Sequence, residues 1–124
     1  MFDRAEARID LDRIKSNINH LRGLSSTPVM AVVKADAYGH GLVPVAKAAL
    51  DAGASSLGVA LLEEAITLRK AGITAPILAW LVPPGSDFKL AVDNQIELAA
   101  SSIKALEEIG AVKSEFRPRV HLEV

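Results

Sequence analysis

The chain has 124 residues, enough for one domain of modest size, and its content of 50% hydrophobic and 23% charged residues is typical of a globular protein. Its 14 basic and 15 acidic side chains give a formal net charge of −1, so nothing indicates a basic surface for nucleic acid or for an anionic membrane. The absence of cysteine excludes disulfides, thiol catalysis and cysteine metal sites.

No targeting or membrane-spanning segment is indicated. The opening Met-Phe-Asp-Arg-Ala-Glu-Ala-Arg contains two acids and lacks the apolar centre of a signal peptide. The longest apolar run, residues 77–82, is far shorter than the ~20 residues that a membrane-spanning helix requires. We therefore expect a soluble cytoplasmic protein that binds neither nucleic acid nor a membrane.

Apolar periodicity and turn residues divide the chain into alternating strands and helices. Residues 5–11 alternate loosely, which is typical of an edge strand and would make residues 1–11 a leading strand. Asp12 is expected to cap an amphipathic helix that ends near Gly23. Further strands are predicted at 29–33, 57–61, 76–82, 96–100 and 119–124, and further helices at 42–52, 63–71, 87–92 and 102–109.

Five strands with helices between them predict an α/β fold with a parallel sheet. The strands are almost continuously apolar, as expected of parallel strands that are buried on both faces. Two architectures fit this pattern, an open doubly wound sheet and part of a (β/α)8 barrel, and composition does not separate them. No interdomain linker is visible, so residues 1–124 are expected to form one unit.

The most informative segment is Val32-Val-Lys-Ala-Asp-Ala-Tyr-Gly-His-Gly41, in which a lysine closes an apolar strand and a glycine-flanked turn follows. Because side chains alternate along a strand, Lys34 is expected at the strand's end on the same face as Met30 and Val32. A partly desolvated amine loses its proton more readily, and a neutral amine attacks carbonyl groups. This position suits a Schiff-base lysine, although a lysine that merely extends its head into water is commoner there.

These ten residues resemble the cofactor-lysine signature of the alanine racemase family, whose members depend on pyridoxal 5′-phosphate. The resemblance extends along nearly the whole chain and is strongest at residues 28–41, 50–65 and 119–124. It implies that the parallel βα repeats form part of a (β/α)8 TIM barrel, truncated after about the fifth strand, because a full barrel takes about 250 residues. We therefore expect the N-terminal half of a larger protein, with residues 1–11 packed on a C-terminal domain.

The resemblance also implies roles for individual residues. Lys34 would hold the cofactor as a Schiff base and move the α-proton of the substrate on one face, and Tyr38 would contact the cofactor phosphate. Trp80 falls where the family places an apolar residue beside the cofactor, although an aliphatic residue followed by glycine is commoner there. Packing in the core is the alternative for Trp80, and packing over the strand end is the alternative for Tyr38.

Glu123 departs from the family pattern. The family's fifth strand commonly carries His-Leu-Lys-Val, and in many members this lysine is carbamylated and fixes an arginine next to the cofactor. Here the sequence is His121-Leu-Glu-Val124, and a glutamate is negatively charged without needing carbon dioxide. We expect Glu123 to orient such an arginine; the alternative is a solvated residue at the end of the chain.

The other polar residues give weaker signals. Asp36 is expected to orient its neighbours or to cap the turn, and His40 to bond to the backbone. His20 and His121 are isolated, and no two histidines have metal-ligand spacing, so no metal is expected. Neither a P-loop nor a complete Gly-x-Gly-x-x-Gly is present, which leaves nucleotide binding without support.

The implied activity is that of an isomerase which interconverts L- and D-alanine through pyridoxal phosphate, supplies D-alanine for peptidoglycan and works as a homodimer. In the family the opposite-face base is a tyrosine of the partner subunit, and the phosphate-binding loops follow later strands. We therefore expect no racemisation by this chain alone. The alternatives are a non-catalytic barrel protein that binds the same cofactor, which the Asp-Ala-Tyr-Gly-His-Gly tail disfavours, and an inactive structural fragment. The amino-acid preference is not evident from these residues.

Overall fold

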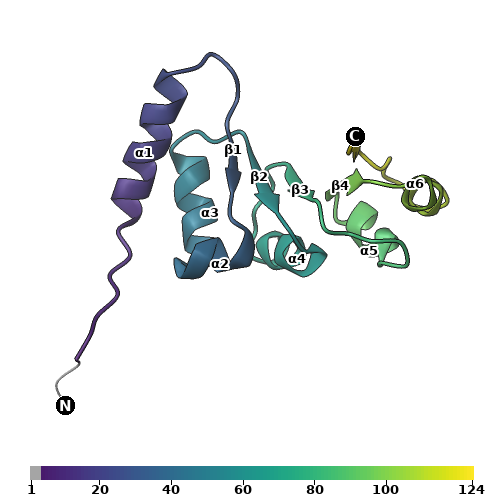
Figure 1. The fold of residues 1–124 in the computed structure, drawn as a ribbon, viewed down its shortest axis with the longest axis horizontal. Helices are drawn as coiled ribbons and strands as arrows, with labels where there is room; N and C mark the ends of the chain where they lie inside the picture. Colours follow the sequence, from purple (N-terminus) through teal and green to yellow (C-terminus); the bar gives the residue numbers. More distant parts are fainter. Residues whose placement is uncertain (1–3) are drawn as a thin grey trace.

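The computed structural model describes residues 4–124, in which parallel strands alternate with helices (Figure 1). The elements in chain order are α1 (Leu11–Gly23), β1 (Met30–Val32), α2 (Lys34–Gly39), α3 (Leu42–Asp51), β2 (Ser56–Val59), α4 (Leu62–Lys70), β3 (Ile77–Ala79), α5 (Phe88–Asp93), β4 (Glu97–Ala100), α6 (Ile103–Gly110) and β5 (Val120–Leu122). Among these described residues, no helix is both long and apolar enough to cross a membrane.

The strands form one sheet in the order β1-β2-β3-β4-β5, and each neighbouring pair is parallel. Strand order reverses at the switch point of a doubly wound sheet, whereas consecutive strands of a barrel lie side by side. The chain-order sheet, of which Figure 1 labels β1 to β4 in sequence, therefore confirms the barrel arrangement of the two that the sequence allowed.

One face of the sheet packs against helices and forms the core. Val33, Leu57, Val59, Ile77 and Leu98 belong to this face and are at most 1% exposed. Burial of such side chains contributes about 1.5–3 kcal/mol each. On the opposite, open face, Met30 and Val32 of β1 remain 37% and 55% exposed. Successive residues along a strand thus alternate between a helix-covered face and an open face, and residues two apart share a face, as the period of two requires.

The start of the chain differs from its prediction. Residues 4–10 form no strand, and α1 begins at Leu11 with Asp10 as its cap in place of Asp12. The Asp10 carboxylate accepts hydrogen bonds from the backbone N–H groups of Asp12 and Arg13, each at 3.1 Å. An alternating segment gains from extension only when another strand pairs with it, and none does so in the described part. Residues 1–3 of the predicted leading strand lie outside the described residues.

Helix α1 packs against α3, and two of its basic side chains contact the carboxyl end of α3. The Arg22 guanidinium donates to the carbonyl of Ala52 at 3.1 Å, and the Lys15 ammonium lies 3.4 Å from a carboxylate oxygen of Asp51. The side of α1 that faces the core carries Leu11 and Ile14, which are only partly buried. This helix therefore covers α3 rather than the sheet itself.

The strands are shorter than predicted. The third strand, expected over 76–82, ends at Ala79, so Trp80 follows β3. Hydrogen bonds to β2 nevertheless continue, from the Trp80 N–H to the Val59 carbonyl (3.3 Å) and from the Leu81 N–H to the Ala60 carbonyl (2.8 Å). The fifth strand likewise spans only Val120–Leu122.

Arg69 of α4 joins two loops at the amino-terminal end of the sheet. Its Nε donates to the Asn94 carbonyl at 2.9 Å, and its Nη1 donates to those of Ile73 (2.8 Å) and Ala75 (2.7 Å). Its Nη2 donates to the Gln95 carbonyl at 3.0 Å. Burial lowers the pKa of the Arg69 guanidinium below its ordinary value. These four contacts fix the entries to β3 and β4.

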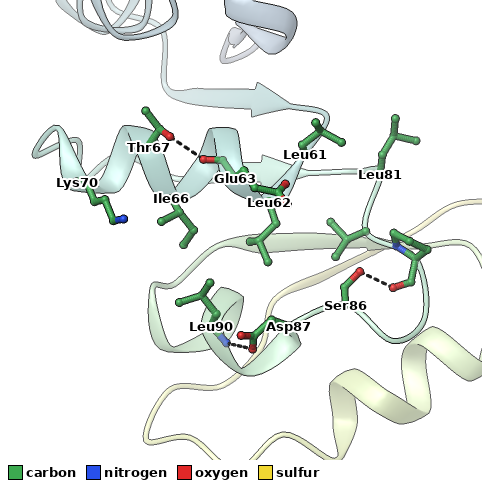
Figure 2. A pocket seen from close by; sticks show the side chains of 12 residues that line it. Leu61, Leu62, Glu63, Ile66, Thr67, Lys70, Leu81, Ser86, Asp87 and Leu90 are labelled. Atoms are coloured by element: carbon green, nitrogen blue, oxygen red, sulfur yellow. Dashed lines mark hydrogen bonds between the residues drawn. The ribbon is translucent and has the colours of Figure 1, made fainter.

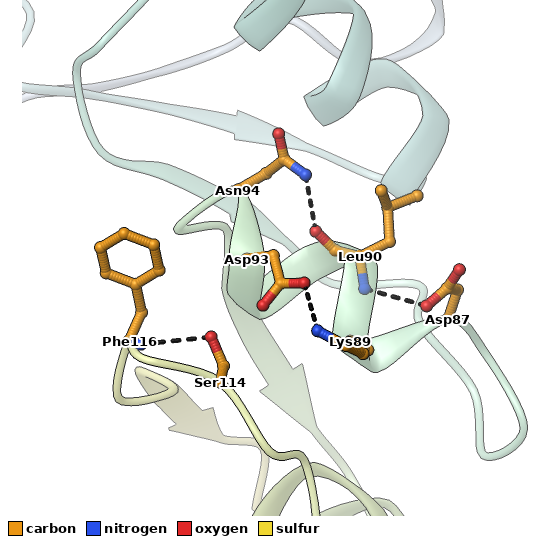
Figure 3. A network of polar contacts seen from close by, with 7 residues as sticks. All are labelled: Asp87, Lys89, Leu90, Asp93, Asn94, Ser114 and Phe116. Carbon is orange, nitrogen blue, oxygen red and sulfur yellow. Dashed lines mark hydrogen bonds and ion pairs between the residues drawn. The ribbon is translucent and has the colours of Figure 1, made fainter.

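Helix α5 is held by side chains at both of its ends (Figure 3). Asp87 caps it by accepting from the Leu90 N–H at 2.9 Å, and the helix lies close to the one predicted over 87–92. One turn later, the Lys89 ammonium lies 2.6 Å from a carboxylate oxygen of Asp93. The capping and the ion pair stabilise a helix too short to form alone.

Candidate functional site

Lys34 lies where the sequence placed it along the chain, at the carboxyl end of β1. The preceding residue, Val33, is 1% exposed and donates its N–H to the Gly58 carbonyl of β2 at 2.9 Å. Lys34 itself is half-buried and begins α2, so the strand alternation that predicted its face ends at Val33. Its Nζ lies 5.7 Å from the ring centroid of Tyr38, whose side chain is 74% exposed. The structure therefore brings these two predicted site residues together.

The segment after Lys34 is a turn of left-handed helix. Residues 35–38 have φ between 51° and 55° and ψ between 36° and 50°. None of them is glycine, and left-handed geometry costs about 1–2 kcal/mol per such residue. The sequence predicted a glycine-flanked turn, and Gly39 and Gly41 do follow with φ of 82° and 96°. Four consecutive strained residues next to the candidate lysine require specific support from their surroundings.

Part of this support comes from the loop itself. Asp36 Oδ1 accepts from the Leu42 N–H at 2.7 Å and so caps α3, which confirms the capping role expected for it. The Asp36 carbonyl accepts from the Gly41 N–H at 3.0 Å. His40 Nδ1 lies 2.9 Å from the Ala37 carbonyl, which confirms that this histidine bonds to the backbone.

The remaining support comes from Glu64, which the sequence analysis did not single out. Its Oε1 accepts from the Ala35 N–H at 2.5 Å, and its Oε2 accepts from the N–H groups of Ala60 (3.0 Å) and Leu61 (2.9 Å). A glutamate in the first turn of a helix is one half of a capping box, but the N-cap here is Leu61, so the usual Ser/Thr signal is missing. The contact with Ala35 joins distant segments and has no local signature.

Trp80 packs against the open face of the sheet. A Cβ placed on Gly58 would lie 2.7 Å from Cζ3 of its indole, so Trp80 lies directly on the backbone of β2. Trp80 is half-buried and does not belong to the core between sheet and helices. The structure therefore does not place Trp80 in that core, which was the alternative for this residue.

Trp80 and Glu123 line the same hollow, of about 440 Å³, at the carboxyl ends of β2 to β5. Its other lining residues are Leu61, Leu81, Val82, Pro83, Ala99 and Ser101. Glu123 is exposed, and its N–H donates to the Ala100 carbonyl at 3.1 Å, which extends the pairing of β5 with β4. This edge is where TIM-barrel enzymes place their active sites.

A larger groove of about 560 Å³ lies between α4 and the segment 81–90 (Figure 2). Apolar side chains such as Leu62, Ile66 and Leu90 line most of it, and its polar lining residues include Lys70 and Asp87. None of the residues predicted for the site lines it. Two of the predicted site residues line the smaller of these two hollows instead.

Three charged or titratable side chains meet on β4 and the start of β5. Glu97 is 6% exposed, and its Oε1 lies 2.8 Å from Arg119 Nη1. Its Oε2 lies 2.7 Å from His121 Nε2. His121, which looked isolated in the sequence, is thus the partner of a buried carboxylate. The cluster lies toward the amino-terminal end of β4, away from Lys34.

The sequence matches a family described as "Alanine racemase, N-terminal domain" over residues 9–124. The alanine racemase of Salinispora arenicola is 52% identical over 122 residues, which cover 97% of this chain and 33% of that protein. The alanine racemase of Mycolicibacterium smegmatis is 55% identical over 112 residues, which cover 90% of this chain and 29% of that protein.

Solved structures agree with these relatives. The alanine racemase from Streptomyces coelicolor A3(2) superposes with a TM-score of 0.86 at 38% identity, over 94% of this chain and 32% of that one. The chain thus spans about a third of the length of the relatives that it matches. Its parallel sheet is the corresponding part of a TIM barrel. The chain belongs to the alanine racemase family, whose N-terminal domain it matches over residues 9–124.

Proposed function

We propose that the protein to which this chain belongs interconverts L- and D-alanine with pyridoxal 5′-phosphate held by Lys34. The observation that carries the proposal is the position of Lys34, half-buried at the carboxyl end of β1 beside Tyr38, in a chain whose named relatives are alanine racemases. Alanine as substrate follows from those names, and the reaction then needs one proton removed from the α-carbon and one returned on the opposite face.

The residues present fit such a cofactor. An aldehyde requires a free primary amine, and among the described residues no carboxylate forms an ion pair with Lys34. A flat ring requires a flat apolar surface, which the Trp80 indole provides on the open face of the sheet. A phosphate requires hydrogen-bond donors, and the exposed phenol of Tyr38 is one. When bound, the cofactor supplies an electrophilic aldehyde and a ring that delocalises the negative charge of the deprotonated α-carbon.

Each residue then has a distinct task. Lys34 would hold the cofactor through its amine, and that amine, when free, would take the α-proton on one face. Tyr38 would donate a hydrogen bond to the phosphate, and the Trp80 indole would offer an apolar surface to the ring. The proton on the opposite face must come from a second base, which the family resemblance assigns to the partner subunit of a homodimer. We therefore propose that these 124 residues alone do not racemise alanine.

Glu123 is proposed to take the place of the carbamylated lysine of other family members. It shares the hollow with Trp80, so its charge is available beside the proposed cofactor position. The test is a chimera that continues this chain with the remainder of the Salinispora arenicola alanine racemase, assayed with and without carbon dioxide. Activity independent of carbon dioxide and lowered by Glu123→Gln is expected, and unchanged activity in Glu123→Gln would remove this role.

The cofactor assignment is tested on the purified chain. Pyridoxal phosphate is added, borohydride is used to fix any adduct, and the modified lysine is located by peptide mass spectrometry. We expect a visible absorbance band and a pyridoxyl group on Lys34, both lost in Lys34→Ala and both retained in Lys47→Ala, which removes an exposed lysine of α3. Equal labelling of all three proteins would mean that surface lysines react and would contradict the proposal. The chimera separates a racemase from a barrel protein that only binds the cofactor, since only the first forms D-alanine.

A further inference from the structure

We propose that Glu64 is a positioning residue for Lys34, a role that rests on the proposed function and goes beyond it. Glu64 lies in the first turn of α4, whereas Lys34 begins α2, after the neighbouring strand. The Glu64 carboxylate links these two βα units, because one of its oxygens contacts the loop of Lys34 and the other contacts the start of α4.

The geometry of the link is specific. Oε1 lies 2.5 Å from the N of Ala35, the residue next to Lys34, and Oε2 accepts from Ala60 at 3.0 Å and from Leu61 at 2.9 Å. Hydrogen bonds from N–H groups to a charged carboxylate are shorter and stronger than bonds between neutral groups. A carboxylate is also the side-chain group that offers acceptors on both oxygens and no competing donor. Glu64 thus serves both loops with one rigid group.

The Lys34 loop depends on this link more than an ordinary turn would. Residues 35–38 are all left-handed, and such backbone persists only where its surroundings determine it. Among the described residues, the hydrogen bonds of residues 35–41 stay within residues 33–45, except for the one to Glu64. Glu64 is therefore the fixed point outside the loop against which the loop is oriented.

Ala35 is the first left-handed residue, and its position determines the position of the Lys34 backbone. Val33 is anchored to β2 through the Gly58 carbonyl, and Ala35 is anchored to α4 through Glu64. Lys34 is the residue between these two anchors. Fixing the residues on both sides restricts the backbone of Lys34, and with it the side from which its amine approaches the cofactor. Holding a reacting group in one geometry is itself a source of rate.

Glu64→Gln tests this role with Glu63→Gln as its matched control. Both variants remove one negative charge from the first turn of α4, but Glu63 is exposed and Glu64 receives the three N–H groups. A glutamine has a single acceptor oxygen. Its NH₂ group must therefore face the N–H donors of one of the two loops, and the hydrogen bonds to that loop are lost. Two properties are measured: amide hydrogen exchange at Ala35 without cofactor, and the rate and visible circular dichroism of the borohydride-trappable adduct on Lys34.

We expect exchange at Ala35 to become about tenfold faster or more in Glu64→Gln, since a hydrogen bond to a charged group is lost. The Lys34 adduct is expected to form more slowly and with a weaker circular dichroism band, while Glu63→Gln matches the wild type in every measurement. A variant that is only less stable would melt at a lower temperature but keep the dichroism band of its folded fraction.

The role is overturned if Ala35 exchanges equally in the wild type and in Glu64→Gln, or if the rate and dichroism of the Lys34 adduct do not change. If Glu64→Gln does not fold, the role is tested on the wild type alone. The measurement is the NMR scalar coupling between the Ala35 amide nitrogen and the Glu64 carboxyl carbon, which is transmitted across their hydrogen bond. Absence of that coupling overturns the role. A wild-type chain that forms no adduct on Lys34 contradicts the proposed function instead, whatever the amide of Ala35 does.

Discussion

Gly58 of β2 and Trp80 after β3 are in such close contact that no side chain fits between them. A Cβ on Gly58 would lie 2.7 Å from Cζ3 of the indole and 3.1 Å from Sδ of Met30. The glycine is therefore required by the close approach of the indole and not by its backbone dihedrals, since its φ is not positive. The same indole lines the hollow at the carboxyl edge of the sheet, so the packing of Gly58 sets one wall of the candidate site.

Gly58→Ala is expected to destabilise the chain by about 1–3 kcal/mol, the usual cost of overpacking a well-filled position. The added methyl group must push the indole off the sheet, because it would lie 2.7 Å from the indole on one side and 3.1 Å from Met30 Sδ on another. Urea unfolding gives the free energy, and the fluorescence of Trp80, the single tryptophan of the chain, reports its greater exposure as a red shift.

Gly110→Ala is the control for this substitution. Gly110 ends α6, and a Cβ there would meet nothing within 4 Å. Alanine in place of glycine should leave the free energy of unfolding unchanged or raise it by up to about 1 kcal/mol. Similar behaviour of the two variants would show that the indole does not press on Gly58.

Arg69→Lys is expected to lower the free energy of unfolding by about 2–4 kcal/mol, since several charge-assisted hydrogen bonds are lost together. The guanidinium holds four backbone carbonyls from two loops at 2.7–3.0 Å. An ammonium has three donors and no planar fork, so it cannot reach both loops at once. The midpoint of urea unfolding measures the change.

Arg13→Lys makes the same exchange at a position without burial. Its guanidinium is 86% exposed and forms an ion pair with Asp10 at 3.1 Å. We expect a change within about 0.5 kcal/mol, as is usual for exposed ion pairs. An equal effect at Arg13 and Arg69 would mean that the carbonyl contacts of Arg69 contribute little.

Much of the fold could be predicted because local rules agreed with the final structure. Helix α3 was expected over residues 42–52, and it spans Leu42–Asp51. Ser102 was expected to open the last helix and caps α6. Strand lengths were overestimated, because apolar residues continue beyond the point where the ladder ends, as at Trp80.

The site was predictable only in part. The sequence around Lys34 and Tyr38 identified these two residues, and the structure places their side chains together. The left-handed turn between them could not be foreseen, since non-glycine residues disfavour it and its outside support comes from Glu64, far along the chain. The pairing of Glu97 with His121 could not be predicted either, because it depends on the register of β4 and β5, which are distant in the sequence.

The Lys89–Asp93 pair predicts how the stability of α5 depends on pH. Hydrogen bonding by the Lys89 ammonium (Figure 3), and then by the Ser114 hydroxyl, lowers the pKa of Asp93 below its ordinary value. A carboxyl group whose pKa is lower in the folded state stabilises the fold above its unfolded pKa of about 3.9, and this contribution is lost as the pH falls through the folded pKa. Acidification should therefore loosen α5 only below the usual range of aspartate.

An NMR titration of the Asp93 carboxyl carbon checks this expectation. Lys89→Met should raise the pKa of Asp93 toward its ordinary value, because the first cause of the shift is removed. Lys104→Met, which removes an exposed lysine of α6, should leave the pKa where it is. If neither substitution moved the pKa, the 2.6 Å contact would have no influence on the carboxyl group in solution.

Tyr38→Phe isolates the phenol proposed to contact the cofactor phosphate. Tyr38 is 74% exposed, so loss of its hydroxyl should change the free energy of unfolding by no more than about 0.5 kcal/mol. Binding of pyridoxal phosphate, followed by its visible absorbance, should weaken about tenfold, the effect of losing a hydrogen bond to a charged group. Pyridoxal, which has the aldehyde without the phosphate, is the matched probe and should bind wild type and variant equally. An equal loss with both compounds would mean that the phenol acts on the ring or on Lys34, which lies 5.7 Å from the ring of Tyr38, and not on the phosphate.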